Sequence, residues 1–312
     1  MKSSSSLSEV PLSEKLREGF RLASMHFRSR REIDFCALDK CVENYDATLA
    51  RYGRLSVRSS KVLEIGFGAR PYRLVWLYGL GVDVLGVDLD TPALKLSPRS
   101  LLQIAEQNGT ERALKSILRY CISDSHRWLQ MASEIERRGR AFRIPEDRLI
   151  VADAASTEFW AQVGRLDFIY SEDVFEHIPS DDLDALIEQM ANALRPNGLA
   201  LIRPMVFTGI CGGHHLEWFP HTFNQKISRR TEPWEHLRRD RFPANTYLNR
   251  LTRKDYVDLF ARHFRILENE TMNPDLGRQF LTSEIRAELS QYGDDELFSN
   301  SVCFVLVPKE MP

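Results

Sequence analysis

Short β-rich runs separated by segments of helical spacing constrain the fold of this chain more than any other feature. Five such runs alternate with the helical segments, at residues 61–65, 82–88, 149–151, 166–170 and 198–202. This alternation is typical of a parallel sheet with helices on both of its faces. Two later runs, residues 264–267 and 302–307, are expected to pair with each other, the second as an antiparallel strand of the same sheet. The sequence therefore predicts an α/β fold with a doubly wound, mostly parallel sheet of seven strands.

The first part of the chain differs from the rest because it shows only helical spacing. Apolar residues such as Leu16 and Phe20 form one stripe in residues 1–59, and a second stripe ends at Gly53. Glycine after the last periodic residue is a common helix stop. We therefore expect an N-terminal helical segment over residues 1–59 and a sheet-forming domain over residues 60–312.

Two insertions are longer than a bare parallel sheet needs. Residues 91–147 follow the second strand and have a helical pattern, with Leu114 and Leu129 among the apolar positions. Residues 207–250 follow the fifth strand. Long loops at the carboxyl ends of parallel strands are where such folds bind ligands. We therefore expect the second insertion to lie on the substrate side.

The best-defined crossover helix lies between the fourth and fifth strands. Ser180 is predicted to be its N-cap, and Asp181 and Asp182 suit the positive end of the helix dipole. Its apolar positions repeat at helical spacing, at Leu183, Leu186, Ile187, Met190 and Leu194. This spacing predicts one buried face over residues 180–194.

The composition excludes several classes of protein. With 42 basic and 44 acidic side chains, the formal charge is −2, so no global field favours a nucleic acid partner. The five cysteines are scattered and form no C-x-x-C pair, which argues against disulfides and a structural zinc site. No window approaches the ~18 apolar residues of a membrane span. We therefore expect a cytoplasmic protein, and the sequence leaves its oligomeric state open.

A glycine-rich turn follows the first strand. Gly66 and Gly68 let the backbone approach a ligand, and Asp88 closes the second strand, where it can accept hydrogen bonds from ribose hydroxyls. A dinucleotide-binding turn would have a third glycine where this chain has Pro71. Glu64 would also repel a pyrophosphate, but it suits a positive charge. The pattern therefore indicates a nucleoside that carries a cationic amino-acid tail.

Longer motifs around these residues resemble those of one enzyme family. They are Val62–Gly68, Val84–Asp88, Asp167–Ile178 and Leu194–Leu199. As a set they are similar to the successive motifs of class I S-adenosylmethionine-dependent methyltransferases, over roughly residues 60–206. Phe67 and the long insertion after Asp88 depart from the usual pattern. The resemblance implies a Rossmann-like fold, S-adenosyl-L-methionine as cofactor and methyl transfer as the activity.

The resemblance also implies which residues bind the cofactor. They are Glu64 near the ammonium, Gly66 and Gly68 along the methionine part, Asp88 at the ribose, Asp153 and Ala154 at the adenine, and Ser171 near the methyl group. An alternative for Asp153 is that its side chain only caps the following turn.

Three histidines are candidate catalytic bases on the acceptor side. Methyl transfer to a hydroxyl benefits from a general base within hydrogen-bond reach of the acceptor. His177 follows the fourth strand, and His214 and His215 follow the fifth, close to Glu217. Adjacent histidines in a loop point in different directions, so no metal is expected here.

Aromatic and asparagine side chains accompany the histidines in residues 207–250, among them Trp218, Phe219, Asn224 and Asn245. Such side chains can stack on a sugar ring and bond to its hydroxyls. The chain downstream resembles methyltransferases found with polysaccharide and glycan biosynthesis, which implies O-methylation of a sugar or glycan-like acceptor.

Three alternatives stay open at this point: another small-molecule acceptor, a lipid-linked acceptor, or a cofactor-binding scaffold without activity. Two arginine-rich runs, residues 137–143 and 238–241, would bind a phosphorylated or nucleotide-linked acceptor if they are functional. Otherwise they are solvated faces.

Overall fold

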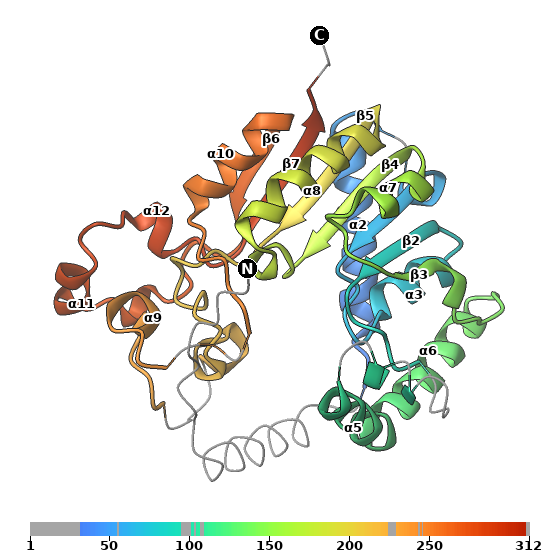
Figure 1. Cartoon of the computed structure of the whole chain (residues 1–312), viewed down its shortest axis with the longest axis horizontal. Helices are drawn as coiled ribbons and strands as arrows, with labels where there is room; N and C mark the ends of the chain where they lie inside the picture. The colour runs from blue at the N-terminus through green and yellow to red at the C-terminus, as the bar shows by residue number, and fades with distance from the viewer. Residues whose placement is uncertain are drawn as a thin grey trace.

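A single mixed sheet forms the centre of the computed structural model (Figure 1), which describes residues 32–54, 56–94, 101–102, 104–106, 109–223, 229–242, 244 and 246–309. Within these residues, seven strands pair in the order β3-β2-β1-β4-β5-β7-β6. The strands are β1 (Lys61–Ile65), β2 (Asp83–Asp88), β3 (Leu149–Val151), β4 (Leu166–Glu172), β5 (Leu194–Arg203), β6 (Phe264–Thr271) and β7 (Val302–Pro308). The strands β1 to β5 run parallel, and β7 pairs antiparallel with both β5 and β6. The predicted doubly wound, mostly parallel fold is confirmed.

The centre of the sheet is apolar on both faces. Leu63 of β1 lies opposite Leu85 of β2 and Ile169 of β4, and Leu63 and Ile169 are fully buried. Parallel strands covered on both faces read as continuous apolar runs, which is why the sequence pattern located them.

Helices cover both faces of this sheet. The one face carries α2 (Phe35–Arg51), α3 (Tyr72–Gly79) and α6 (Ser125–Arg137), and the other carries α7 (Thr157–Val163), α8 (Ser180–Ala193) and α10 (Arg253–His263). Tyr45 and Trp76 are fully buried in the first layer, and Phe260 packs on Phe304 in the second, with ring centroids 5.0 Å apart. In the described part of the chain, no helix has both the length and the apolarity to cross a membrane.

The chain reverses its direction of winding at β1. It crosses from β1 to β2 on one side and later adds β4 on the other. In such sheets, ligands bind in the crevice at the carboxyl ends of the two strands where the order reverses. Gly66 follows β1 at this edge and Glu172 ends β4 there. The fold therefore positions a ligand site between these two strand ends.

The crossover helix α8 begins as predicted, but its N-cap is Pro179 and not Ser180. The carbonyl oxygen of Pro179 accepts hydrogen bonds from the backbone N–H groups of Asp182 and Leu183, both at 3.0 Å, so Ser180 is already the first helical residue. Leu194 is not part of this helix, because it begins β5. The other predicted apolar positions, from Leu183 to Met190, are fully buried.

The insertion after β2 is helical in its described residues. It contains α5 (Thr110–Arg119), a π-helical turn (Tyr120–Asp124) and α6. Trp128 and Ile135 pack against the first helical layer. Leu114 and Leu129, two of the apolar positions in the predicted helical pattern, lie in helices α5 and α6 and are 59% and 70% exposed.

The N-terminal prediction is tested only in part. The second predicted stripe forms α2, which packs Tyr45 and Leu49 on the sheet and is followed by Gly53 at φ 66°. Leu16 and Phe20 lie outside the described residues, as do Asn224 and Asn245. The domain boundary near residue 60 stays a prediction.

Two segments distant in the sequence form one cap over an edge of the sheet. β5 and β6 end at this edge and β7 begins there, and the described residues of 205–242 and 272–300 build the cap. It contains α9 (Glu235–Arg238), α11 (Ser283–Glu288) and α12 (Asp294–Leu297), which lie together in Figure 1. Its members share an apolar cluster separate from the two main layers, and Trp218 meets Phe280 at 5.1 Å between ring centroids. The sequence analysis anticipated only the first of these segments.

A matched pair of leucine variants checks this assignment of core and surface. We expect Leu183→Ala to lower the free energy of unfolding by about 2–5 kcal/mol, because the side chain is fully buried in α8. Leu129→Ala removes the same atoms from an exposed position in α6, so its effect should stay within about 0.5 kcal/mol. Denaturant unfolding followed by circular dichroism measures both. A loss above about 2 kcal/mol in the Leu129 variant would contradict its exposed placement.

Candidate functional site

The glycine turn after β1 is shaped by contacts with the end of β2. The N–H of Gly66 donates to the carbonyl oxygen of Val87 at 2.8 Å, and the N–H of Gly68 donates to Asp88 Oδ2 at 2.7 Å. Gly66 has φ 83°, a conformation that favours glycine. A Cβ atom at this position would lie 2.1 Å from Val174 Cγ2. Gly66 therefore permits both the turn and the close approach of the chain that leaves β4.

Asp88 lies at the turn, where the sequence placed it. Its Oδ2 accepts from Gly68 and its Oδ1 accepts from the N–H of Asp90 at 2.7 Å. The residue is only partly buried. One carboxylate thus shapes the glycine turn at the end of β2. Its contact with the ribose stays a prediction.

Glu64 has the features expected of a group that meets a cation. The residue is 4% exposed, and its Oε2 atom is buried without a hydrogen-bond partner. Burial raises the pKa of this carboxyl to about 7, although the nearby Arg73 guanidinium and the Tyr170 hydroxyl oppose the shift. A buried oxygen without a donor is unfavourable, and the ammonium of S-adenosylmethionine would supply one. Glu64, the glycine turn and Asp88 therefore fit this cofactor.

A partly buried ionic network acts on Glu64 through Arg73. Glu172, the last residue of β4, pairs with Arg73 at 3.0 Å and with Arg203 at 3.1 Å, and it accepts a hydrogen bond from the hydroxyl of Tyr45 at 2.9 Å. These partners come from α3, β5 and α2. The sequence analysis missed this network. The sequence could have indicated it, because charged residues, Glu172 and Arg203, end the fourth and fifth strands.

The other predicted cofactor residues make local contacts. Ser171 lies inside β4 rather than after it, and its buried hydroxyl donates to the carbonyl oxygen of Ile65 at 2.8 Å, which ties β4 to the start of the glycine turn. Asp153 accepts from the N–H of Ala155 at 2.8 Å, so it does cap its own turn. Ala154 accepts from the indole of Trp160 at 2.7 Å. Adenine contacts by Asp153 and Ala154 stay predictions.

The candidate bases His177 and His214 come together although 36 residues separate them in the chain. Their ring centroids are 4.9 Å apart and the rings are nearly perpendicular, at 82°. His177 Nδ1 lies 2.9 Å from the carbonyl oxygen of Tyr247, and His214 Nε2 lies 3.9 Å from Glu176 Oε1. One donor atom from each of Glu176, His177 and His214 lies within 4.8 Å of the others. We call these three residues the histidine cluster.

Burial sets the protonation of two members of this cluster. Glu176 is 3% exposed, and burial together with the nearby Asp173 carboxylate raises its pKa to about 8. Burial and the neighbouring His177 and His215 lower the pKa of His214 to about 4. Near pH 7, Glu176 is therefore mostly protonated, whereas His214 is neutral and keeps a free lone pair.

His215 and Glu217 do not join this cluster. The ring of His215 faces His236, at 6.1 Å between centroids. Glu217 Oε1 accepts hydrogen bonds from the N–H groups of Arg230 and Thr231 and from the Thr231 hydroxyl, at 2.9, 2.5 and 2.5 Å. Glu217 thus holds the cap together. The adjacent histidines His214 and His215 thus have different neighbours, and a catalytic role of His215 stays a prediction.

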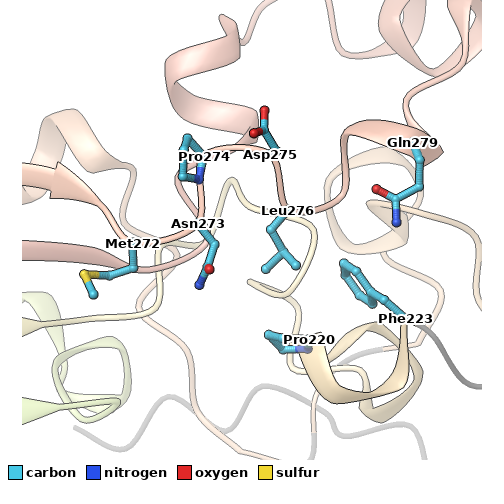
Figure 2. Close-up of a pocket in the computed structure, with 8 residues that line it drawn as sticks. All are labelled: Pro220, Phe223, Met272, Asn273, Pro274, Asp275, Leu276 and Gln279. Atoms are coloured by element: carbon cyan, nitrogen blue, oxygen red, sulfur yellow. The ribbon is translucent and has the colours of Figure 1, made fainter. Parts of the chain in front are cut away.

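A pocket of about 380 Å³ opens in the cap. Figure 2 shows the side chain of Leu276 between those of Asn273 and Phe223. The lining residues are Pro220, Phe223, Met272, Asn273, Pro274, Asp275, Leu276 and Gln279. Pro220 directly follows Phe219, whose ring lies 5.9 Å from that of His214. One short segment therefore borders both the pocket and the histidine cluster.

The arginine-rich runs are engaged in ion pairs with acidic neighbours. The pairs are Arg137–Glu134, Arg138–Asp39, Arg143–Asp147, Arg238–Glu288, Arg239–Glu232 and Arg241–Glu235. Of these pairs, Arg138–Asp39 and Arg238–Glu288 join segments distant in the sequence. Binding of a phosphorylated acceptor by the two runs stays a prediction.

We expect Asp88→Ala to weaken the binding of S-adenosylmethionine at least about tenfold, because a charge-assisted hydrogen bond contributes about 1.5–3 kcal/mol. Calorimetric titration with the cofactor measures this change. Asp83→Ala is the matched control, since Asp83 begins the same strand and pairs with the surface residue Arg148. Unchanged affinity in the Asp88 variant would move the ribose contact elsewhere, with Asp90 the first residue to examine.

Solved structures that resemble the chain share little sequence with it. The PH0226 protein from Pyrococcus horikoshii OT3 is 14% identical, with 87% of this chain and 91% of that chain covered and a TM-score of 0.40. A TehB-like SAM-dependent methyltransferase from Corynebacterium glutamicum is 13% identical, with coverage of 88% and 100% and a TM-score of 0.35. The glycopeptide N-methyltransferase MtfA, in complex with S-adenosyl-L-homocysteine, is 14% identical, with coverage of 86% and 90% and a TM-score of 0.38. At this level of similarity, the substrates of these proteins are not assigned to this chain.

A protein family can be assigned to most of the chain. No curated protein matches the chain. A family model described as a methyltransferase domain matches residues 38–263, which is more than two thirds of the chain and includes the glycine turn, Asp88 and the histidine cluster. The chain therefore belongs to the methyltransferase-domain family, as an S-adenosylmethionine-dependent enzyme of class I.

Proposed function

We propose that the enzyme transfers the methyl group of S-adenosylmethionine to a hydroxyl group of a sugar or glycan-like acceptor. The observation that carries this proposal is the histidine cluster, in which a neutral His214 lies against His177 next to the end of β4. The predicted cofactor residues belong to the neighbouring strand β1, since Glu64 lies in this strand and Gly66 directly follows it.

The proposed step needs a base and an aligned acceptor. The hydroxyl proton passes to an imidazole nitrogen of the cluster, and an oxygen lone pair forms the bond to the methyl carbon. The carbon–sulfur bond breaks at the same time and its electron pair stays on sulfur, which leaves neutral S-adenosylhomocysteine. Alignment of the oxygen with the carbon–sulfur bond supplies most of the remaining acceleration.

Protonation decides which member of the cluster is the better base. A base must be unprotonated at the working pH. The raised pKa of Glu176, about 8, keeps this carboxyl mostly protonated near pH 7. The lowered pKa of His214, about 4, keeps its imidazole neutral. We therefore assign the base to His214, with His177 in contact with its ring.

The composition of the cap pocket supports a sugar-like acceptor. Phe223 offers an aromatic ring, whereas Asn273 and Gln279 offer amide groups. An aromatic ring stacks on the apolar face of a sugar, and the polar groups bond to its hydroxyls. A pocket of about 380 Å³ has the size of a small-molecule site.

Replacing either histidine should slow methylation without loss of the cofactor. We expect His214→Ala and His177→Ala to lower the rate by about 10²–10⁴, with nearly unchanged affinity for S-adenosylmethionine. Release of S-adenosylhomocysteine from a panel of sugars and glycans measures the rate, and calorimetry measures the affinity. His126→Ala, in the distant helix α6, is the control histidine. Full activity in both cluster variants, or acceptance of the methyl group only by amines or thiols, would overturn the proposal.

The pH dependence separates the candidate bases. Because burial lowers the pKa of His214 to about 4, kcat/KM for the acceptor should stay level from pH 7.5 down to about 5.5 when S-adenosylmethionine is saturating. The bound cofactor keeps Glu64, whose own pKa is about 7 without it, paired and ionised. A base with an ordinary histidine pKa of about 6.5 would lose about tenfold over this range. A decline centred near pH 6.5 would assign the base to another histidine. A rate that reaches its plateau only above pH 8 would assign it to ionised Glu176.

A further inference from the structure

We propose that Glu176, His177 and His214 form a binding site for a divalent transition-metal ion, with one carboxylate oxygen and two imidazole nitrogens as ligands. The sequence analysis expected no metal, because it considered only the adjacent pair His214 and His215. The fold instead pairs His214 with two residues that follow β4.

The spacing of the donor atoms is close to that of a metal site. The three candidate atoms lie within 4.8 Å of one another, and His214 Nε2 is 3.9 Å from Glu176 Oε1. Metal–nitrogen and metal–oxygen bonds of about 2.0–2.2 Å place neighbouring tetrahedral donors roughly 3.4 Å apart. Small side-chain rotations, without any backbone movement, would therefore close the three donors around an ion.

A second contact prepares His177 as a ligand. Its Nδ1 lies 2.9 Å from the carbonyl oxygen of Tyr247. Because a carbonyl can only accept a hydrogen bond, Nδ1 carries the proton and Nε2 keeps its lone pair. Histidine ligands of metals commonly donate their other N–H to a carbonyl or carboxylate in this way, which fixes the orientation of the ring.

The unpartnered atoms of the cluster point independently to a missing cation. Both carboxylate oxygens of Glu176 are buried without a partner in hydrogen-bond geometry, and so is His214 Nε2. Glu176 is 3% exposed, and a buried polar group without a partner is unfavourable. The backbone N–H groups of Glu176 and Met205 lie near enough to stabilise the carboxylate of Glu176, but burial and Asp173 outweigh their effect and its pKa stays raised. A divalent ion would satisfy the orphaned atoms together.

The donor set selects the kind of ion. Two imidazoles and one carboxylate suit zinc, iron, cobalt or nickel, whereas magnesium and calcium prefer oxygen ligands alone. Three protein ligands leave coordination positions open, as in catalytic zinc sites. The carboxylate of Asp173 is close enough to act on Glu176 and adds negative charge near the site.

The role of the ion rests on the proposed function, but its binding does not. A hydroxyl of the acceptor would occupy an open position, where the positive charge makes it lose its proton more readily. In the metal-bound enzyme both imidazole lone pairs would be used as ligands, so His214 would be the base only in the metal-free enzyme. With the ion bound, the proton would pass to the free oxygen of Glu176 and on to water. The oxygen would attack the methyl carbon as before.

The test measures the metal without any acceptor. The full chain, free of any affinity tag and treated with chelator, is titrated with Zn²⁺ by calorimetry and with Co²⁺ by visible absorption. We expect one equivalent to bind, with the cobalt spectrum of a four- or five-coordinate ion. His177→Ala, His214→Ala and Glu176→Gln should each weaken this binding at least about tenfold, whereas His126→Ala should leave it unchanged.

Two results would overturn the site. One is the same Zn²⁺ affinity in the cluster variants as in the unaltered chain, which would place the ion elsewhere. The other is a Co²⁺ spectrum of the hydrated ion alone in the unaltered chain, which does not depend on how well the variants fold. A failed search for an acceptor alters neither result, so failure of the proposed function and failure of the metal site are distinguishable.

Discussion

The carboxylate of Glu172 holds the ligand edge of the sheet together. It ends β4 and binds groups from α2, α3 and β5, which include two arginines. If either arginine were removed, Glu172 would keep the other arginine and the Tyr45 hydroxyl as partners, so the two ion pairs support each other. Because Arg73 also acts on Glu64, the same network sets the electrostatic surroundings of the cofactor carboxylate. Strand ends, helical layer and cofactor site are thus coupled through one side chain.

The sequence predicted the parts of the molecule that local patterns determine. Buried parallel strands such as β1 are continuous apolar runs, and α8 repeats its leucines at helical spacing, so both were placed within a few residues. The glycine turn and Asp88 were recognisable because strand, turn and acidic residue follow one another closely. Helical spacing alone did not tell which apolar residues of the insertion after β2 face the core, and Leu114 and Leu129 prove to be exposed.

Long-range contacts account for what the sequence did not show. Glu176 and His214 belong to different loops, and only the pairing of β4 with β5 brings those loops together. Glu217 looked like a partner of its neighbours His214 and His215, but its carboxylate turns to the backbone of Thr231 instead. The core of the cap depends in the same way on contacts such as that of Trp234 with Phe298.

The cap has a consequence for how the acceptor side of this enzyme can diversify. Its two halves are separated in the chain by α10 and β6, which belong to the sheet, and Arg238 in the first half forms a paired salt bridge with Glu288 in the second. If one loop alone formed the acceptor site, exchange of that loop between related enzymes would be enough to change the acceptor. Here a new acceptor preference requires matched changes in two stretches of sequence, because each half supplies one wall of the pocket and one side of the core beneath it.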